Sequence, residues 1–217
     1  MAGFLLQNKN NFPNPDTADE DGLLAIGSNF DTGTLLKAYR RGIFPWFNEG
    51  KNIFWYHPDP RFVLFPEKLK ISHSIRNVMN KKIFRFTVNK AFSEVIKNCK
   101  ISVRKNQPET WITDEFEFAY NSLYQQGYAC SAETWENNEL VGGLYGVLIG
   151  KVFFGESMFS KTSNASKFAF IKWVEFLQKN KIELIDCQVY TQHLASFGAE
   201  LIPRKIFINL LDKLIVE

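Results

Sequence analysis

Two polar side chains interrupt the apolar segment LIDCQV, which covers residues 184–189. Asp186 and Gln188 are two residues apart, so on a strand they lie on one face, while Cys187 points into the core as an inert thiol. A carboxylate beside a carboxamide can hold an ammonium group, orient it or accept its proton. The segment therefore predicts a site for a basic ligand.

Glu156 interrupts a second apolar segment, FFGESMFS, directly after Gly155. Burying an acidic group in an apolar strand costs free energy unless the group is paired, so we expect Glu156 either to reach solvent or to bind a cationic partner. Gly155 would let another group approach the backbone closely. If the two segments pair as strands, Glu156 converges with Asp186 and Gln188 in an electronegative cleft, which suits a basic ligand better than a phosphate.

The sequence lacks the motifs of serine-nucleophile catalysis, nucleotide binding, metal binding and disulfide frameworks. Ser157 and Ser160 lack the G-x-S-x-G pattern of a nucleophile elbow, and His57 lies in HPDPR, where a turn residue is expected. The sequence has no Gly-rich phosphate loop, its three histidines have no metal-ligand spacing, and its three cysteines are an odd number without paired spacing. We therefore expect no nucleotide cofactor, no metal and no disulfide framework, which is typical of a reducing cytoplasm.

Charge is distributed unevenly along the 217 residues, although the net charge is only +3. Residues 61–110 carry 12 basic and 3 acidic residues, whereas both flanking regions are acidic. A basic middle is typical of a polyanion-binding surface, and solvated helix faces would give the same count. No DNA-binding motif, secretory signal or membrane-spanning apolar run is recognisable.

The elements that must position these side chains follow from periodicity and turn residues. Strands at 128–135, 140–149 and 152–156 are joined by tight turns, which predicts an antiparallel meander. A long helix should begin at Ser163 or Asn164 and end near Gln178, before a buried strand at 182–189 and a last helix from Pro203. Composition changes near Pro58. We expect an α+β protein in which most of the 33 aromatic residues form the core and some line a pocket.

Several long motifs occur in a fixed order along the chain. They are ADEDGLLAIG, LLKAYRRGIFPWF, HPDPR, TWI, ELVGGLYGV, FFGESMFS, NASK, IDCQV and GAELIPR. With this set, the sequence closely resembles the leucyl/phenylalanyl-tRNA–protein transferase family from Phe12 to about Leu211.

The resemblance implies a small N-terminal lobe at 1–60 and a GNAT-like acyltransferase domain with a mostly antiparallel sheet at 61–217. It implies transfer of Leu, Phe and less readily Met from aminoacyl-tRNA to proteins with N-terminal Arg or Lys, which creates an N-degron. It further implies a cytoplasmic monomer that needs no cofactor, metal or membrane. The aminoacyl ester is already activated, so aligning two substrates can supply most of the catalysis.

The resemblance also assigns roles to residues. Asp186 and Gln188 would orient the attacking amine, with Asp186 either a base acting through Gln188 or a positioning group. Glu156 would hold an ammonium or the basic side chain of the acceptor. The implied donor pocket consists of Leu144, Phe153, Ser157, Met158, Trp173, Leu177 and Ile185. Trp46 and Trp111 would lie near the 3′ adenosine, and the implied tRNA contacts are Arg76, Lys81, Lys82 and Arg85.

The residues leave two other function classes open. A GNAT-type acetyltransferase that uses acetyl-coenzyme A would need a pyrophosphate loop before its helix, and SKTSNAS lacks one. Acetylation of a basic peptide would favour that alternative. A non-catalytic module that binds tRNA or degrons would lose only affinity when Asp186 or Gln188 is replaced by Ala.

Overall fold

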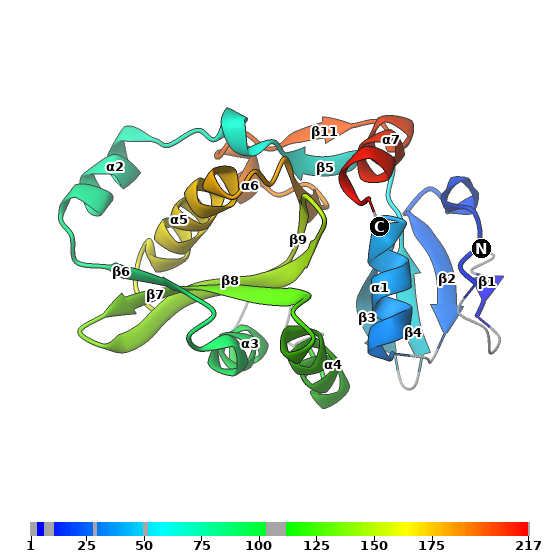
Figure 1. Cartoon of the computed structure of the whole chain (residues 1–217), viewed down its shortest axis with the longest axis horizontal. Helices are drawn as coiled ribbons and strands as arrows, with labels where there is room; N and C mark the ends of the chain where they lie inside the picture. Colours follow the sequence, from blue (N-terminus) through cyan, green and yellow to red (C-terminus); the bar gives the residue numbers. More distant parts are fainter. Residues whose placement is uncertain (1–3, 7–10, 28–29, 50–51, 103–111, 217) are drawn as a thin grey trace.

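The computed structural model describes the whole chain except residues 1–3, 7–10, 28–29, 50–51, 103–111 and 217. The described part is an α+β structure with two separate β-sheets (Figure 1). Most strand pairs are antiparallel, as expected from the sequence.

The smaller sheet comes from the N-terminal residues and has the strand order β1-β2-β4-β3. Its strands are β1 (Phe4–Leu5), β2 (Leu23–Gly27), β3 (Phe44–Glu49) and β4 (Asn52–Tyr56). Helix α1 (Thr32–Arg40) begins where the Asp31 carboxylate accepts the N–H of Thr34 at 2.8 Å. Leu35, Ala38 and Tyr39 form its buried face. This face brings Tyr39 into the core, where it can reach the other sheet.

The larger sheet has the strand order β11-β5-β10-β9-β8-β7-β6. Its strands are β5 (Arg61–Leu64), β6 (Arg85–Val88), β7 (Ala129–Glu136), β8 (Glu139–Ile149), β9 (Val152–Ser160), β10 (Leu184–Gln188) and β11 (Glu200–Ile202). The predicted meander β7-β8-β9 is confirmed, and β9 continues past Glu156. Strand β10 pairs with β9 in parallel and with β5 in antiparallel orientation. The two polar segments found in the sequence are therefore neighbours in the sheet.

Helices cover both faces of the larger sheet (Figure 1). Helix α5 lies on one face, with α2 beyond it, and α3 and α4 lie on the other. The helices after α1 are α2 (His73–Asn80), α3 (Phe92–Ile101), α4 (Asp114–Gln125), α5 (Ala165–Lys179), α6 (Gln192–Ala195) and α7 (Arg204–Leu214), and two 3₁₀ turns cover Pro15–Thr17 and Pro66–Lys68. The long helix predicted near 163–178 and the last helix predicted after Pro203 are both present.

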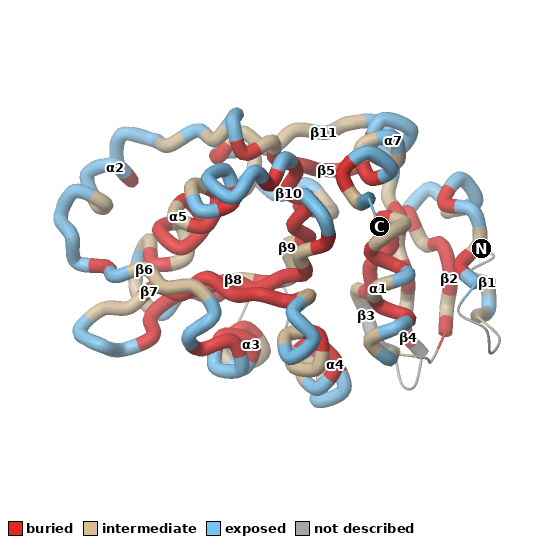
Figure 2. Tube along the Cα trace, viewed as in Figure 1, coloured by how far each residue is buried: buried red, intermediate tan, exposed pale blue. Residues whose placement is uncertain are grey.

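One apolar cluster joins the two sheets. It contains Trp55 from β4, Phe154 from β9 and Phe207 from α7. Figure 2 shows buried stretches in both parts of the molecule, in β8 and β9 and in α1 and β2. Residues 57–60 lead the chain from β4 in the smaller sheet into β5 in the larger one, and the core continues across this change of sheet.

Candidate active site

A cavity of about 580 Å³ lies beside the middle of β9 and the C-terminal end of β10. Residues from β3, β8, β9, β10, α5 and α6 line it. Most of its wall is apolar, with Leu144, Phe153, Phe170 and Ile185 among the lining residues. Glu156 and Gln188 bring polar groups to the same space. This combination, an apolar hollow with a few convergent polar groups, is typical of small-molecule sites.

Two irregularities in strand pairing aim the polar side chains. On β8, the adjacent residues Tyr145 and Gly146 pair with Ser157 and Gly155 of β9, so Glu156 is an extra, unpaired residue of a bulge. A second shift in register follows Asp186 on β10. Bulges re-aim side chains and are frequent next to active sites.

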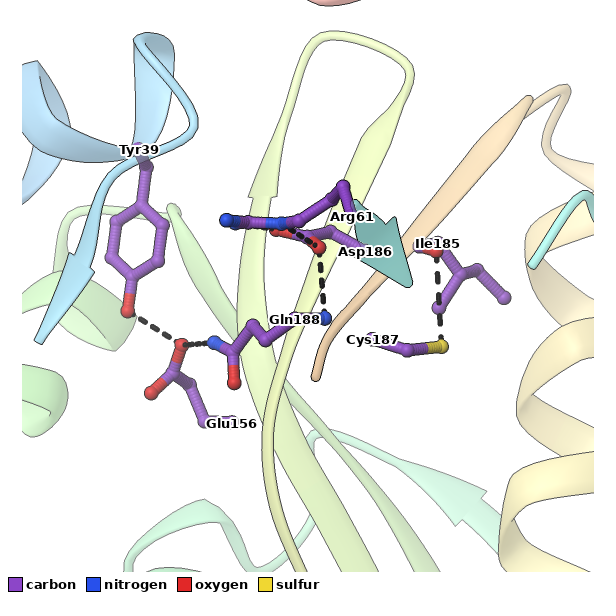
Figure 3. A network of polar contacts seen from close by, with 7 residues as sticks. All are labelled: Tyr39, Arg61, Glu156, Ile185, Asp186, Cys187 and Gln188. Atoms are coloured by element: carbon purple, nitrogen blue, oxygen red, sulfur yellow. Dashed lines mark hydrogen bonds and ion pairs between the residues drawn. The ribbon is translucent and has the colours of Figure 1, made fainter. Parts of the chain in front are cut away.

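Glu156 is held by three hydrogen-bond donors. The Tyr39 hydroxyl donates to Oε1 at 2.6 Å, and the Gln188 side-chain amide donates to the same oxygen at 3.0 Å (Figure 3). The Tyr120 hydroxyl donates to Oε2 at 2.9 Å. The hydroxyls of Tyr39 and Tyr120 are themselves 2.5 Å apart. The carboxylate is therefore fixed in place from α1, α4 and β10, while part of Glu156 stays accessible from the cavity.

Asp186 is bound by a different partner, Arg61, the first residue of β5 (Figure 3). Arg61 Nε donates to Oδ1 at 2.8 Å and Nη2 donates to Oδ2 at 2.6 Å, and both side chains are 0% exposed. The guanidinium lies between the rings of Phe44 and Phe207, at 4.7 and 4.6 Å from their centroids. Such cation–π contacts are strongest when they are desolvated, as here.

The same carboxylate fixes the backbone at Gln188. The Gln188 N–H donates to Asp186 Oδ1 at 2.9 Å, and Gln188 has a φ of 66°. A residue other than Gly rarely adopts this left-handed conformation without a local constraint. The Gln188 side chain therefore points towards Glu156 because Asp186 holds the turn that follows β10.

The environment of Glu156 changes its acidity. Burial raises the pKa of this carboxyl group from 4.5 to about 7, although the hydrogen bonds from Tyr39 and Tyr120 lower it and the charge of Asp186 raises it further. Burial, followed by the charge of Glu156, raises the pKa of both tyrosines. Glu156 is thus able to exchange a proton near neutral pH.

Comparison with known sequences identifies the family. The model of the leucyl/phenylalanyl-tRNA protein transferase family matches residues 63–212, and the model of the N-terminal domain of the same transferases matches residues 28–59. The chain belongs to this family. It is therefore an aminoacyltransferase whose activity involves tRNA.

Relatives of this transferase match over nearly their whole length. A leucyl/phenylalanyl-tRNA–protein transferase of Flavobacterium psychrophilum is 54% identical over 93% of this chain and 96% of its own. The relative from Christiangramia forsetii is 50% identical over 96% of this chain and 99% of its own. Solved structures are more distant. The C-terminal domain of a putative lysylphosphatidylglycerol synthetase from Agrobacterium fabrum covers 82% of this chain and 65% of its own, with a TM-score of 0.48 and 9% identity, which is too weak a likeness to indicate function.

Most of the residues predicted for the site of this transferase lie together at the cavity. Glu156, Asp186 and Gln188 are in contact as described, and the predicted residues that line the hollow are Trp46, Leu144, Phe153, Ser157, Met158 and Ile185. Trp46 packs edge-on against Tyr56, with ring centroids 5.6 Å apart. Trp111 lies outside the described residues.

Three expectations about single residues need correction. Trp173 and Leu177 are buried in the core and do not line the cavity. Phe153 does line it, and its ring packs against the Trp173 ring with centroids 5.1 Å apart. Phe170 is the residue of α5 that reaches the cavity. Cys187 is buried in the core, as predicted, and also lies on the cavity wall.

The third correction concerns Gly155, where the sequence predicts a close backbone approach. A Cβ there would be 3.5 Å from the nearest atom, which is an ordinary contact. The close approach is at Gly146 on β8, where a Cβ would be 2.1 Å from the Phe154 carbonyl oxygen.

The sequence did not single out Arg61, Tyr39 or Tyr120. Arg61 lies in the motif HPDPR and begins the apolar strand β5, and a cation in that position signals a buried anionic partner. Tyr39 and Tyr120 each lie on the buried face of a helix, where nothing distinguishes them from core aromatics. His57, expected to be a turn residue, is fully buried, and burial lowers its pKa to about 3.

The remaining predicted residues lie on the surface. Arg76 on α2, Lys81 and Lys82 after it, and Arg85 at the start of β6 are all exposed. Within the described ranges, no cluster of His, Cys, Asp and Glu could hold a metal ion. Nor does any helix among the described residues have the length and apolar character needed to cross a bilayer.

Proposed function

We propose that this transferase moves Leu, Phe and, less readily, Met from aminoacyl-tRNA to the N-terminal Arg or Lys of acceptor proteins. The observation that carries the proposal is the apolar cavity that ends on Glu156 and Gln188. The apolar wall suits an unbranched or aromatic donor side chain, and the carboxylate suits the cationic end of the acceptor. β-Branched donors fit such a slot poorly, and a difference of one methyl group is worth only about 1–3 kcal/mol.

The reaction requires the acceptor amine and the ester of aminoacyl-tRNA to be bound next to each other in the right orientation. The ester of aminoacyl-tRNA is already activated, so the acceptor amine attacks its carbonyl carbon directly. Alignment of the two substrates can contribute roughly 7–11 kcal/mol to catalysis. In this proposal Trp46 stacks on the 3′ adenosine, and Arg76, Lys81, Lys82 and Arg85 bind phosphates of the acceptor stem.

The proposal includes the organisation of the chain and its role in the cell. Residues 1–60 form a small lobe and residues 61–217 a GNAT-like catalytic domain. The protein acts as a monomer in the cytoplasm without a cofactor, and its product carries a new N-terminal residue that serves as an N-degron.

A transfer assay with the pure protein tests the proposal. Radiolabelled Phe should move from charged tRNA to a peptide with N-terminal Arg, and a peptide with an acetylated N-terminus is the control. Absence of transfer would refute the proposed activity. Acetylation of the same peptide with acetyl-coenzyme A would instead favour an acyl-CoA-dependent enzyme.

Gln188→Ala distinguishes an enzyme from a binding module. The variant removes the amide that contacts Glu156, and it leaves the Arg61–Asp186 pair intact. We expect transfer to slow at least tenfold while aminoacyl-tRNA still binds. Unchanged turnover would remove Gln188 from the reaction centre.

A further inference from the structure

The proposed reaction requires a group that removes a proton from the acceptor amine. A peptide α-amino group has a pKa of about 7.7–8.0, so most acceptor amines are protonated at neutral pH and cannot attack an ester. Two carboxylates lie at the cavity, Asp186 and Glu156. The question is which of them takes the proton.

Both carboxylate oxygens of Asp186 already accept hydrogen bonds from fixed donors. Arg61 occupies Oδ1 and Oδ2, and the Gln188 N–H also binds Oδ1. Protonation of Asp186 would leave the Arg61 guanidinium buried without its counter-ion, at a high cost. Arg61 cannot turn away easily, because its guanidinium is held between Phe44 and Phe207.

Glu156 has the opposite properties. It lines the cavity, and no cationic group contacts it among the described residues. Three oxygen–oxygen contacts connect Glu156, Tyr39 and Tyr120, at 2.5, 2.6 and 2.9 Å. The two phenols supply only two protons for these three contacts. One further proton on the carboxyl group would complete the ring of hydrogen bonds.

We propose that Glu156, held by Tyr39 and Tyr120, takes the proton that the acceptor amine loses, and that Arg61 and Asp186 are positioning residues. This inference rests on the proposed function. Around Glu156 lie Tyr39 from α1, Tyr120 from α4 and the residues of β10. The pKa of the Glu156 carboxyl group, about 7, suits proton exchange with an amine near neutral pH.

The ammonium N–H bond breaks and its proton moves to Glu156, which leaves a neutral amine. The amine nitrogen forms a bond to the ester carbonyl carbon. The bond from that carbon to the ribose oxygen then breaks, and the ribose oxygen takes the proton from Glu156. The attacking nitrogen, which is positively charged after the attack, loses its second proton to solvent as the amide forms. The ionised carboxylate is restored, because the proton it received has gone to the leaving ribose.

Two matched acceptors test this inference. One is a peptide with N-terminal Arg and an ordinary α-amine, and the other carries an aminooxy group in place of that amine, which is unprotonated at neutral pH. Glu156→Gln keeps the size of the side chain and cannot take a proton. We expect it to slow single-turnover transfer to the amine by about 10²-fold or more and transfer to the aminooxy acceptor by less than about tenfold.

Arg61→Lys is the matched control. Because Arg61 only positions Asp186 and Gln188, this variant should slow transfer to both acceptors by the same factor.

Tyr39→Phe tests the same inference through the pH dependence of the rate. This variant removes one hydrogen-bond donor to the Glu156 carboxylate, so the pKa of Glu156 should rise. The acid limb of the plot of transfer rate against pH should therefore move to higher pH.

The outcomes are distinct. An equal loss for both acceptors in Glu156→Gln would overturn the inference and leave Glu156 as a binding group. Selective loss of the amine reaction in Arg61→Lys would also overturn it. If the unaltered protein transfers Phe to neither acceptor, the proposed function fails, and this inference fails with it. Binding of an aminoacyl-adenosine mimic shows that each variant is folded.

Discussion

Arg61 connects three parts of the molecule through one side chain. Its ion pair reaches β10, and the two rings that enclose its guanidinium come from β3 and α7. A buried ion pair adds little net stability compared with apolar residues of similar size, but removing one partner is expensive because the other charge stays buried. The pair therefore fixes the geometry of Asp186 and Gln188 more than it stabilises the fold.

Arg61→Met should reveal this asymmetry. We expect the free energy of unfolding in urea to fall by about 3–5 kcal/mol, because Asp186 loses its counter-ion in a dry environment. The double variant Arg61→Met/Asp186→Leu should lose less than Arg61→Met alone. Equal losses for the single and double variants would contradict the argument.

At the scale of elements, the β8–β9 bulge decides where Glu156 points. The bulge inserts Glu156 between two paired residues of β9, Gly155 and Ser157, and Gly146 on β8 pairs with Gly155. A Cβ at Gly146 would be 2.1 Å from the Phe154 carbonyl oxygen and 2.6 Å from Phe153 Cζ. Glycine is therefore required there for the two strands to approach.

Two glycines of the same bulge make a matched pair of variants. Gly146→Ala forces the strands apart and should lower the free energy of unfolding by roughly 1–3 kcal/mol or more, as overpacking does. Gly155→Ala meets nothing closer than 3.5 Å, so it should cost clearly less. Urea unfolding of both variants measures the difference, and equal costs would show that the close approach at Gly146 is unimportant.

At the scale of the whole molecule, the exposed cations on and after α2 do not line the cavity. Helix α2 lies at one end of the molecule, the smaller sheet lies at the other, and α7 lies between them (Figure 1). The exposed cations on and after α2 belong to the stretch 61–110, which has 12 basic and 3 acidic residues. Such a surface can bind phosphates without touching the reaction centre.

Charge reversal tests this surface. Lys81→Glu/Lys82→Glu should weaken tRNA binding and reduce its dependence on salt, because fewer counter-ions are released. Lys205→Glu/Lys213→Glu makes the same change in net charge on α7 and should have a smaller effect. Equal effects of the two pairs in a binding titration at several salt concentrations would place the tRNA elsewhere.

The sequence by itself determined the meander, the long helix after it, the last helix and the apolar segments around Glu156 and Asp186. These depend on residue spacing, turn residues and helix caps, which act over short distances along the chain. The sequence also predicts that Glu156 converges with Gln188 if their two strands pair, and β9 and β10 do pair.

Only the tertiary structure decided which groups surround the two carboxylates. Tyr39 is 117 residues from Glu156 in the chain, and Arg61 is 125 residues from Asp186. Nothing local to Tyr39 or Tyr120 distinguishes a core aromatic from a hydrogen-bond donor, and no local pattern encodes the bulge that aims Glu156. These contacts arise when two sheets pack and water leaves, because only then must each buried charge and each phenol find a partner.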